Sequence, residues 1–212
     1  MRAASLREFG PPEVLTLTEV ETPPAGPGEV RVRVKVAGVQ PADCAVRGGW
    51  TPPGATLKLP QIPGNEFAGT IDQVGNRVPG LEVGDEVLGF RVLECYAEYV
   101  VVPASQIVKK PTSLPWEVAG GLTGAGQTAH IALEQLGFGA GDTVLIHAAA
   151  GAVGTLAVQL ARLRGALGTA SPTNHDYLRE LGAEPVAYGE GLVDRVRHLA
   201  REGIGAATRR GG

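Results

Sequence analysis

Three small residues at fixed spacing form the part of the chain that could hold a phosphate group. Ala148, Gly151 and Gly154 make the pattern A-x-x-G-x-x-G, which follows an apolar run at 143–146 and opens an apolar pattern of helical spacing. Such a turn lets free backbone N–H groups and a helix dipole hold the charge of a pyrophosphate. The same residues could serve only the tight packing of a strand against a helix. The strand–turn–helix context favours a dinucleotide site.

The end of the second predicted strand bears on which dinucleotide would bind. An NAD site usually places an acid there to bind the ribose hydroxyls. This chain has Ser171 at that point and no acid before Asp176. Ser171, and Tyr188 at the end of the third predicted strand, can each donate a hydrogen bond to a 2′-phosphate. The sequence therefore favours NADPH, although no Arg or Lys stands beside Ser171, which could be only a turn residue.

The elements that would position these residues change in kind along the chain. Up to about residue 110 the pattern is strand-like, because 29–39 alternates apolar and charged residues and 96–103 is rich in β-formers. Gly and Pro turns separate these runs, which predicts a small barrel or sandwich. One helix, capped by Ser113, is expected over 113–137.

The remainder of the chain alternates predicted strands and helices, which indicates a parallel sheet with right-handed crossovers. The expected order is strand, helix, strand, helix, strand and helix, over 143–146, 152–164, 166–170, 174–181, 185–188 and 192–201. The tail after residue 202 is glycine-rich and without strand character, so three strands are expected, where a full dinucleotide fold has about six. We expect domains at 1–111 and 112–212.

Composition narrows the function classes. The chain has 212 residues, 43% of them hydrophobic, and a net charge of −3, so no basic surface indicates nucleic-acid binding. No apolar stretch reaches the length of a membrane span, and the first residues lack the apolar core of a signal peptide. Two cysteines are too few for a disulfide framework. These features favour a cytoplasmic protein without nucleic-acid or membrane partners.

Four segments of the chain resemble the medium-chain dehydrogenase/reductase superfamily, and most of all its zinc-free quinone oxidoreductase branch. They are "GNEFAGTIDQVGNRV" (64–78), "GDEVLGF" (84–90), "YAEYVVVPAS" (96–105) and "GDTVLIHAAAGAVGTLAVQLAR" (141–162). The likeness runs from Arg2 to about Arg201. It implies an α/β fold with an all-β N-terminal domain, in which a chaperonin-10-like β domain is followed by a partial Rossmann doubly wound parallel sheet.

Two departures from the zinc-containing members of this superfamily concern the metal. Those members carry a Cys and a His ligand at the positions of Gln40 and Asn65, and neither amide is a normal zinc ligand. The lobe of four closely spaced cysteines is missing as well. Cys44 and Cys95 lack zinc-site spacing and are expected to be packing residues. The resemblance with these departures therefore implies that no metal is bound.

Hydride transfer needs no metal when the acceptor is already electrophilic, as a quinone or an α,β-unsaturated carbonyl is. The resemblance implies that Thr128 and the turn Gly151–Ala152–Val153 contact the cofactor. It also implies that Gln40 approaches the nicotinamide and the substrate. Gln40 could instead only cap a short helix at 41–47, and Thr128 could only pack within its helix. A tyrosine common in the family corresponds to Ala45.

Two functions of different class follow. The first is an NADPH-dependent reductase of a small-molecule quinone or enone. The alternative is a truncated, catalytically silent family remnant that acts as a binding or scaffold protein, because the strands that normally support the nicotinamide half are missing. In either case the third strand would be an exposed edge near 185–188, where a second copy could pair to form a homodimer.

Overall fold

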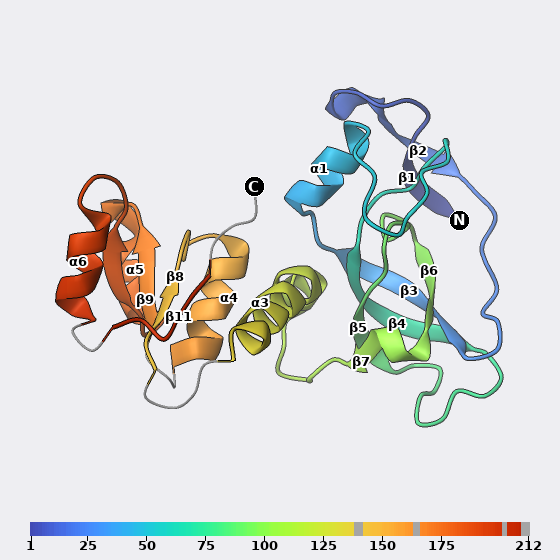
Figure 1. Cartoon of the computed structure of the whole chain (residues 1–212). Helices are drawn as coiled ribbons and strands as arrows, with labels where there is room; N and C mark the ends of the chain where they lie inside the picture. The colour runs from blue at the N-terminus through green and yellow to red at the C-terminus, as the bar shows by residue number, and fades with distance from the viewer. Residues whose placement is uncertain (138–141, 163–165, 201–202, 209–212) are drawn as a thin grey trace. The chain divides into compact units, whose positions relative to one another are not determined.

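The computed structural model describes residues 1–137, 142–162, 166–200 and 203–208. The chain divides into two compact units, Met1–Gly124 and Ala125–Gly212 (Figure 1). The first unit is dominated by antiparallel strands and the second by parallel strands and helices. The expected mixed α/β class is therefore confirmed, whereas the domain boundary at 111/112 stays a prediction.

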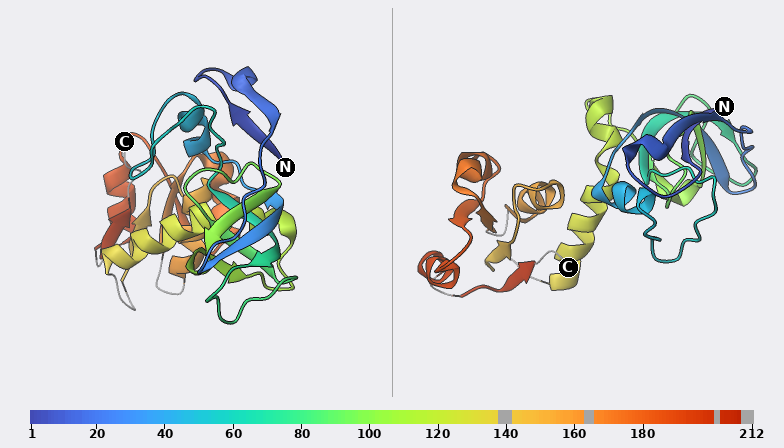
Figure 2. Two further views of the ribbon diagram at one scale, coloured as in Figure 1. Left: turned by 90° about the vertical axis from the view of Figure 1, so that its right-hand side faces the viewer. Right: turned by 90° about the horizontal axis from the view of Figure 1, so that it is seen from above.

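Strands of the first unit form two sheets. One sheet pairs β1 with β2, and the other has the strand order β6-β3-β4-β5-β7 with antiparallel pairing throughout. The seven strands are β1 (Arg2–Leu6), β2 (Leu15–Glu19), β3 (Glu29–Ala37), β4 (Glu66–Val74), β5 (Glu86–Phe90), β6 (Tyr99–Pro103) and β7 (Ile107–Lys109). The larger sheet is curled (Figure 2), as expected of the β domain.

The alternation seen in the sequence places β3 in this sheet. Val30 and Val32 are fully buried and pack in one cluster with Phe67 of β4. Arg31, between the two valines, makes an ion pair of 2.9 Å with Asp72. One apolar face and one charged face are typical of an antiparallel strand with a single covered side.

A single helix over 113–137 was expected, and this prediction is wrong. The structure has two helices, α2 (Trp116–Gly120) and α3 (Thr123–Leu136), separated by a turn. The N-cap of α2 is Pro115 rather than Ser113, because the Leu114 N–H bonds the carbonyl of Pro111 in a preceding turn. The pair of glycines after Ala119 lets α2 end, and Gly120 lies so close to β3 that a Cβ there would stand 2.5 Å from Val36 Cγ1.

The second unit has the predicted alternation of strands and helices. Its elements are β8 (Val144–Ile146), α4 (Ala152–Ala161), β9 (Ala166–Ala170), α5 (His175–Glu180), β10 (Glu184–Ala187), α6 (Leu192–Leu199) and β11 (Ala206–Thr208). All strand pairs are parallel, in the order β10-β9-β8-β11. The expected helix continuations at 163–164 and at 201 lie outside the described residues.

The expectation of three strands is also wrong, because β11 forms a fourth. It is three residues long and pairs with β8, which lies between it and β9. A strand of this length carries no periodicity, and the glycines before it hid it in the sequence. The order β10-β9-β8-β11 places the fourth strand of this unit, β11, beside its first strand, β8, as in a doubly wound sheet. In the complete doubly wound fold the third strand, here β10, is also an edge strand. An exposed third strand is therefore no sign of an incomplete sheet.

Both faces of the parallel sheet are covered by helices. Val144 and Ile146 of β8 pack in a cluster with residues of α3, α4 and α5, whereas Leu145 packs in another with Val196 of α6. Burial on both faces explains why β8 is apolar at every position. None of the helices in the described part of the chain is long and apolar enough to span a bilayer.

Candidate functional site

An open pocket of about 450 Å³ lies at the carboxyl ends of β8 and β9. Ligands of open α/β sheets bind at this edge. The pocket is lined by His147, Ala148, Ala150, Gly151, Thr169, Ala170, Ser171, Asn174 and Tyr188. The structure therefore brings three of the predicted cofactor residues, Gly151, Ser171 and Tyr188, to one place, although they come from three separate segments.

The turn between β8 and α4 has the geometry of an anion site. Gly151 is the N-cap of α4 and has no side chain to cap the first turn, so the helix begins with free N–H groups. The Thr155 N–H makes the first helical bond, 2.8 Å to the Gly151 carbonyl. The predicted residues Ala152 and Val153 lie in this first turn, both with exposed side chains. A phosphate at this end of α4 would meet backbone donors and the positive end of the helix dipole.

The two glycines of the motif have different roles. A Cβ on Gly154 would overlap the Ala148 carbonyl oxygen and lie 2.6 Å from Ala149 Cα, so Gly154 allows α4 to pack against the turn. A Cβ on Gly151 would lie 3.2 Å from the Ala148 carbonyl oxygen. Gly151 is exposed and lines the pocket, which leaves room for a ligand. The two glycines therefore fit the two interpretations of the motif: Gly154 allows tight packing of the helix, and Gly151 leaves space for a phosphate.

Thr169 of β9 holds the turn from the neighbouring strand. Its Oγ1 accepts the Ala148 N–H at 3.2 Å, and its carbonyl accepts the Ala149 N–H at 2.9 Å. Ala148 has a φ of 52°, a left-handed conformation that glycine adopts more easily. The backbone bonds to Thr169 stabilise this conformation.

Ser171 is both a turn residue and a pocket residue. It precedes a short 3-10 helix, Pro172–Asn174, and its carbonyl accepts the Asn174 N–H at 2.9 Å. Its hydroxyl accepts a hydrogen bond of 3.1 Å from Asn174 Nδ2 and lies 2.9 Å from Thr173 Oγ1. None of the described residues that line the pocket is acidic. A phosphate near Ser171 would therefore meet no carboxylate of the pocket wall.

Three polar residues of the pocket were missed by the sequence analysis: His147, Thr169 and Asn174. Thr169 could have been found, because it lies two positions before Ser171 on a strand and so shares its face. His147 directly follows β8, which places it at the ligand-binding edge of the sheet. Asn174 gave no sequence signal apart from its place in the turn after β9.

Gln40 lies in the first unit, at the N-cap of α1 (Pro41–Arg47). Its backbone N–H donates a bond of 2.7 Å to Asp43 Oδ2, and its carbonyl accepts the Asp43 N–H at 3.0 Å. Its side chain has a further partner, since Nε2 donates to Glu66 Oε1. Glu66 is fully buried and its other oxygen accepts the Gly124 N–H at 2.7 Å.

The same short helix is tied to the loop before β6. The Tyr96 hydroxyl donates a bond of 2.8 Å to Asp43 Oδ2, the carboxylate oxygen that also caps Gln40. Burial raises the pKa of Tyr96 above its usual range, and the neighbouring Asp43 raises it further. Hydrogen bonds thus join Tyr96 to Asp43 and Asp43 to the backbone of Gln40, while the bond to Glu66 fixes the amide of Gln40.

The other residues singled out in the sequence are not among those that line the pocket. Thr128 is exposed on α3 and is not among the pocket residues. Asn65, at the second position where the zinc members have a ligand, has a buried Oδ1 with no hydrogen-bond partner. Cys95 is buried in the core as expected, whereas Cys44 is exposed on α1 and is not a packing residue. Its place on the open side of a short helix explains the difference.

A bound metal ion would need several neighbouring His, Cys, Asp or Glu side chains. Within residues 1–137, 142–162, 166–200 and 203–208, no group of three or more His, Cys, Asp and Glu side chains is placed to hold a metal ion. The amides of Gln40 and Asn65 are poor zinc ligands by their chemistry.

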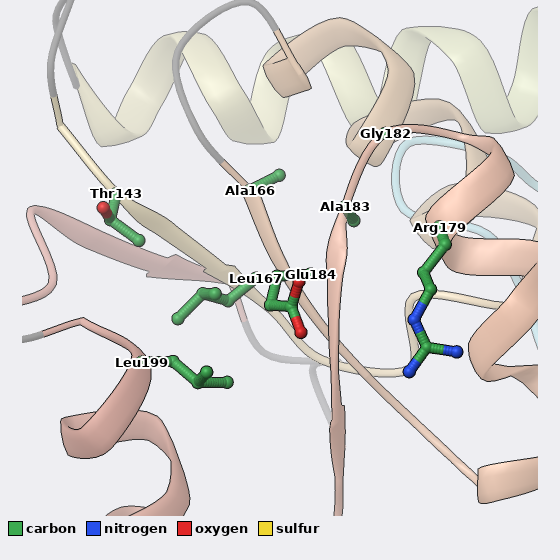
Figure 3. A pocket seen from close by; sticks show the side chains of 8 residues that line it. All are labelled: Thr143, Ala166, Leu167, Arg179, Gly182, Ala183, Glu184 and Leu199. Carbon is green, nitrogen blue, oxygen red and sulfur yellow. The ribbon is translucent and has the colours of Figure 1, made fainter.

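A second pocket, of about 470 Å³, lies at the opposite edge of the parallel sheet (Figure 3). Thr143 precedes β8, while Ala166 and Glu184 are the first residues of β9 and β10. The pocket is therefore at the amino ends of the strands. The N-termini of the crossover helices, which could bind a phosphate, lie at the carboxyl ends of the strands instead.

Comparison with known proteins agrees with this architecture. Residues 26–115 match the alcohol dehydrogenase GroES-like domain family. A solved NAD-dependent alcohol dehydrogenase is 33% identical, with a TM-score of 0.86 over 95% of this chain and 68% of its own. The chain belongs to the medium-chain dehydrogenase/reductase superfamily.

Other members of this superfamily indicate the chemistry of the relatives. The Escherichia coli quinone oxidoreductase, solved in complex with NADPH, is 27% identical, with a TM-score of 0.82 over 95% of this chain and 63% of its own. The 2-methylene-furan-3-one reductase of Solanum lycopersicum is 33% identical over 87% of this chain and 51% of its own. The chain spans about half or less of the length of the curated relatives that it matches. Both of these named relatives are oxidoreductases.

Proposed function

We propose that this chain is an NADPH-dependent oxidoreductase that passes a hydride to a quinone or an α,β-unsaturated carbonyl without zinc. The observation that carries the proposal is the pocket at the carboxyl ends of β8 and β9, which opens onto the N-terminus of α4. Ala152, Val153 and Gly154 would hold the pyrophosphate there through backbone N–H groups, and Gly151, whose own N–H bonds the Ala148 carbonyl, would leave room for it. When bound, the nicotinamide supplies the hydride.

Several features support NADPH over NADH. Ser171 and Tyr188 provide hydroxyl groups in a pocket whose described lining has no carboxylate to repel a 2′-phosphate. The Escherichia coli quinone oxidoreductase was solved with NADPH. An alcohol dehydrogenase described as NAD-dependent is a relative as well, so the preference rests on the residues of this pocket.

The choice of acceptor follows from the residues at the two zinc positions. Gln40 and Asn65 carry amides at the positions of the zinc ligands, and amides are poor ligands for the zinc ion that polarises an alcohol in the zinc-containing members. Quinones and enones are electrophilic without that help. Gln40, with its amide fixed by Glu66, would orient the nicotinamide or the acceptor, and Thr128 would contact the cofactor. The acceptor is proposed as a class, in keeping with the quinone oxidoreductases and the furanone reductase among the relatives.

Calorimetric titration with NADPH tests the cofactor assignment. The purified chain should bind NADPH more tightly than NADH, and Gly151→Val should abolish binding because the side chain would fill the space of the phosphate. Gly121→Val is the matched control, since a Cβ at Gly121 meets nothing within 4 Å. Unchanged affinity in Gly151→Val, with the variant folded, would show that the turn holds no phosphate.

The reaction itself is tested by NADPH oxidation with a simple quinone, followed at 340 nm. Elemental analysis of protein purified without a metal-affinity tag should find far less than one zinc per chain. A stoichiometric zinc that resists mild chelation would overturn the metal-free part of the proposal.

A further inference from the structure

His147 joins the pocket to a buried hydroxyl. The residue directly follows β8 and lines the pocket together with Ala148 and Gly151. Its Nδ1 lies 3.3 Å from Oγ1 of Thr169, a side chain that is only 2% exposed. The same Oγ1 accepts the Ala148 N–H at 3.2 Å. One threonine therefore contacts both the backbone of the turn and the imidazole.

The hydrogen-bonding capacity of Thr169 decides where the proton of a neutral His147 lies. The Ala148 N–H can only donate, so it occupies one lone pair of the hydroxyl and leaves the hydroxyl proton free. A buried hydroxyl is stabilised by giving this proton to an acceptor, and His147 Nδ1 is within reach. Nδ1 is then the acceptor, and the imidazole carries its proton on Nε2.

The same threonine suits the charged imidazole. If His147 is protonated, Nδ1–H donates to the second lone pair of Thr169 Oγ1 and the hydroxyl proton rotates away. Nε2 carries a proton in both states. Because Nδ1 faces Thr169, Nε2–H lies on the other side of the ring as a donor that Thr169 does not use.

We propose that His147 is a cofactor-binding residue, which donates from Nε2 to a phosphate or ribose oxygen of the bound dinucleotide. Thr169 is its positioning residue, because it fixes which nitrogen is the donor. This inference rests on the proposed function, since it places a ligand in the pocket that Gly151 and Ser171 also line. A donor at this point suits an anionic ligand, and the described lining contains no lysine or arginine that would supply one.

Titration of a set of variants tests the assignment. His147→Leu should weaken NADPH binding on the order of tenfold, the usual effect of losing a bond to a charged oxygen. His147→Gln, whose amide nitrogen can take the place of Nε2, should restore most of the affinity, whereas His147→Asn should not. His198→Leu, on the exposed surface of α6, is the matched control and should bind as the unmodified chain does.

Shorter ligands separate the two kinds of acceptor oxygen. If His147 bonds the 2′-phosphate, His147→Leu should weaken NADPH and 2′-phospho-ADP-ribose but leave NADH unchanged. If it bonds a ribose or pyrophosphate oxygen, all three should weaken by the same factor. Equal affinity of His147→Leu and the unmodified chain for every ligand would overturn the proposal.

The role of Thr169 has a readout of its own. In ¹⁵N-edited long-range spectra the neutral imidazole of His147 should be the Nε2–H tautomer, and Thr169→Val should shift it toward a mixture of tautomers. Thr169→Val should also weaken NADPH binding severalfold, and its effect should be smaller in a chain that already carries His147→Leu, where only the bond to the Ala148 N–H remains to be lost. An Nδ1–H tautomer in the unmodified chain, or additive effects, would overturn this role.

The outcomes distinguish the inference from the function on which it rests. If NADPH binds and Gly151→Val abolishes binding while His147→Leu has no effect, the proposed function stands and the role of His147 is wrong. If the unmodified chain binds no dinucleotide, the proposed function fails and the ligand of His147 fails with it. Thermal unfolding of each variant shows whether it is folded, and His147→Leu removes no hydrogen bond from the backbone of the turn.

Discussion

Ala148 occupies a backbone conformation at which a glycine would be less strained. Its φ of 52° lowers the free energy of unfolding by on the order of 1 kcal/mol for an alanine. A glycine would avoid this strain, but the greater freedom of its unfolded chain would lower the free energy of unfolding by somewhat less than that amount. We expect Ala148→Gly to raise the free energy of unfolding by a few tenths of a kcal/mol up to about 1 kcal/mol. Urea denaturation measures the change.

The neighbouring alanine provides the control for that prediction. Ala149 is fully buried, has no positive φ, and lies close enough to Gly168 that a Cβ on that glycine would stand 2.9 Å from its own. Ala149→Gly should therefore lower the free energy of unfolding by about 1 kcal/mol or more. If both substitutions destabilise equally, the left-handed conformation of Ala148 is not a source of strain.

Tyr96 should make the stability of the chain fall at high pH. Burial, together with the bond to Asp43, raises its pKa in the folded state above the ordinary value of about 10. Because the pKa of Tyr96 is higher in the folded than in the unfolded chain, its contribution to the free energy of unfolding is fully present at pH values below the unfolded pKa. That stability is lost as the pH rises from about 10 toward the folded pKa, by up to about 1.4 kcal/mol per pH unit.

The variant Tyr96→Phe isolates this effect. It should be less stable than the unmodified chain at pH 7 by about 1 kcal/mol, because the bond to Asp43 is lost, and the difference should shrink above pH 10. Burial raises the pKa of Cys95 as well, but this residue is present in both proteins and cancels in the comparison. Urea denaturation at a series of pH values gives the two curves, and parallel curves would contradict the prediction.

At the scale of elements, Gly154 sets how closely α4 approaches the turn after β8. The atoms that a Cβ would meet belong to the backbone of Ala148 and Ala149, which cannot rotate away as a side chain would. Gly154→Ala should therefore lower the free energy of unfolding by about 1–3 kcal/mol and weaken NADPH binding, because the first turn of α4 would shift. Gly121→Ala, in open space, should have little effect on either.

The elements that the sequence predicted well are those with a long pattern. β3 was expected from its alternation and a short helix was expected at 41–47, and both lie where they were predicted, although β3 ends at Ala37. β11 was missed because its three residues, Ala-Ala-Thr, follow a glycine-rich run and are not strongly apolar as those of β8 are. The break between α2 and α3 was missed because "AGGLTGAG" is apolar and small throughout, so the pattern continues although the helix does not.

The site shows the same division between local and non-local information. Gly151 and Gly154 were found from a motif within seven residues. Thr169 was not, because its contact with the turn depends on the parallel pairing of β8 with β9, about twenty residues away in the sequence. The bond from Gln40 to Glu66 likewise depends on how β4 pairs with β3.

At the scale of the whole molecule, the two units differ in what fills their cores. The larger cluster of the first unit is built from valine, isoleucine, Phe67 and Cys95. In the larger cluster of the second unit, seven of the twelve buried residues in the described part of the chain are alanine. Each Å² of apolar surface that is removed from water stabilises the fold by about 25 cal/mol. A buried alanine removes less of this surface than a larger apolar side chain does. The second unit should therefore be the less stable of the two.

Hydrogen exchange followed by mass spectrometry tests this difference. Amides of β8 and β9 should exchange before those of β3 and β4, because regions with less buried apolar surface open at lower free energy. NADPH at a hundredfold excess over its dissociation constant should stabilise the second unit by about 2.7 kcal/mol and slow exchange there, while β3 and β4 keep their rates. Peptides from both units that exchange together, with and without NADPH, would show instead that the chain unfolds as one cooperative body whose alanine-rich core is no weaker than the rest.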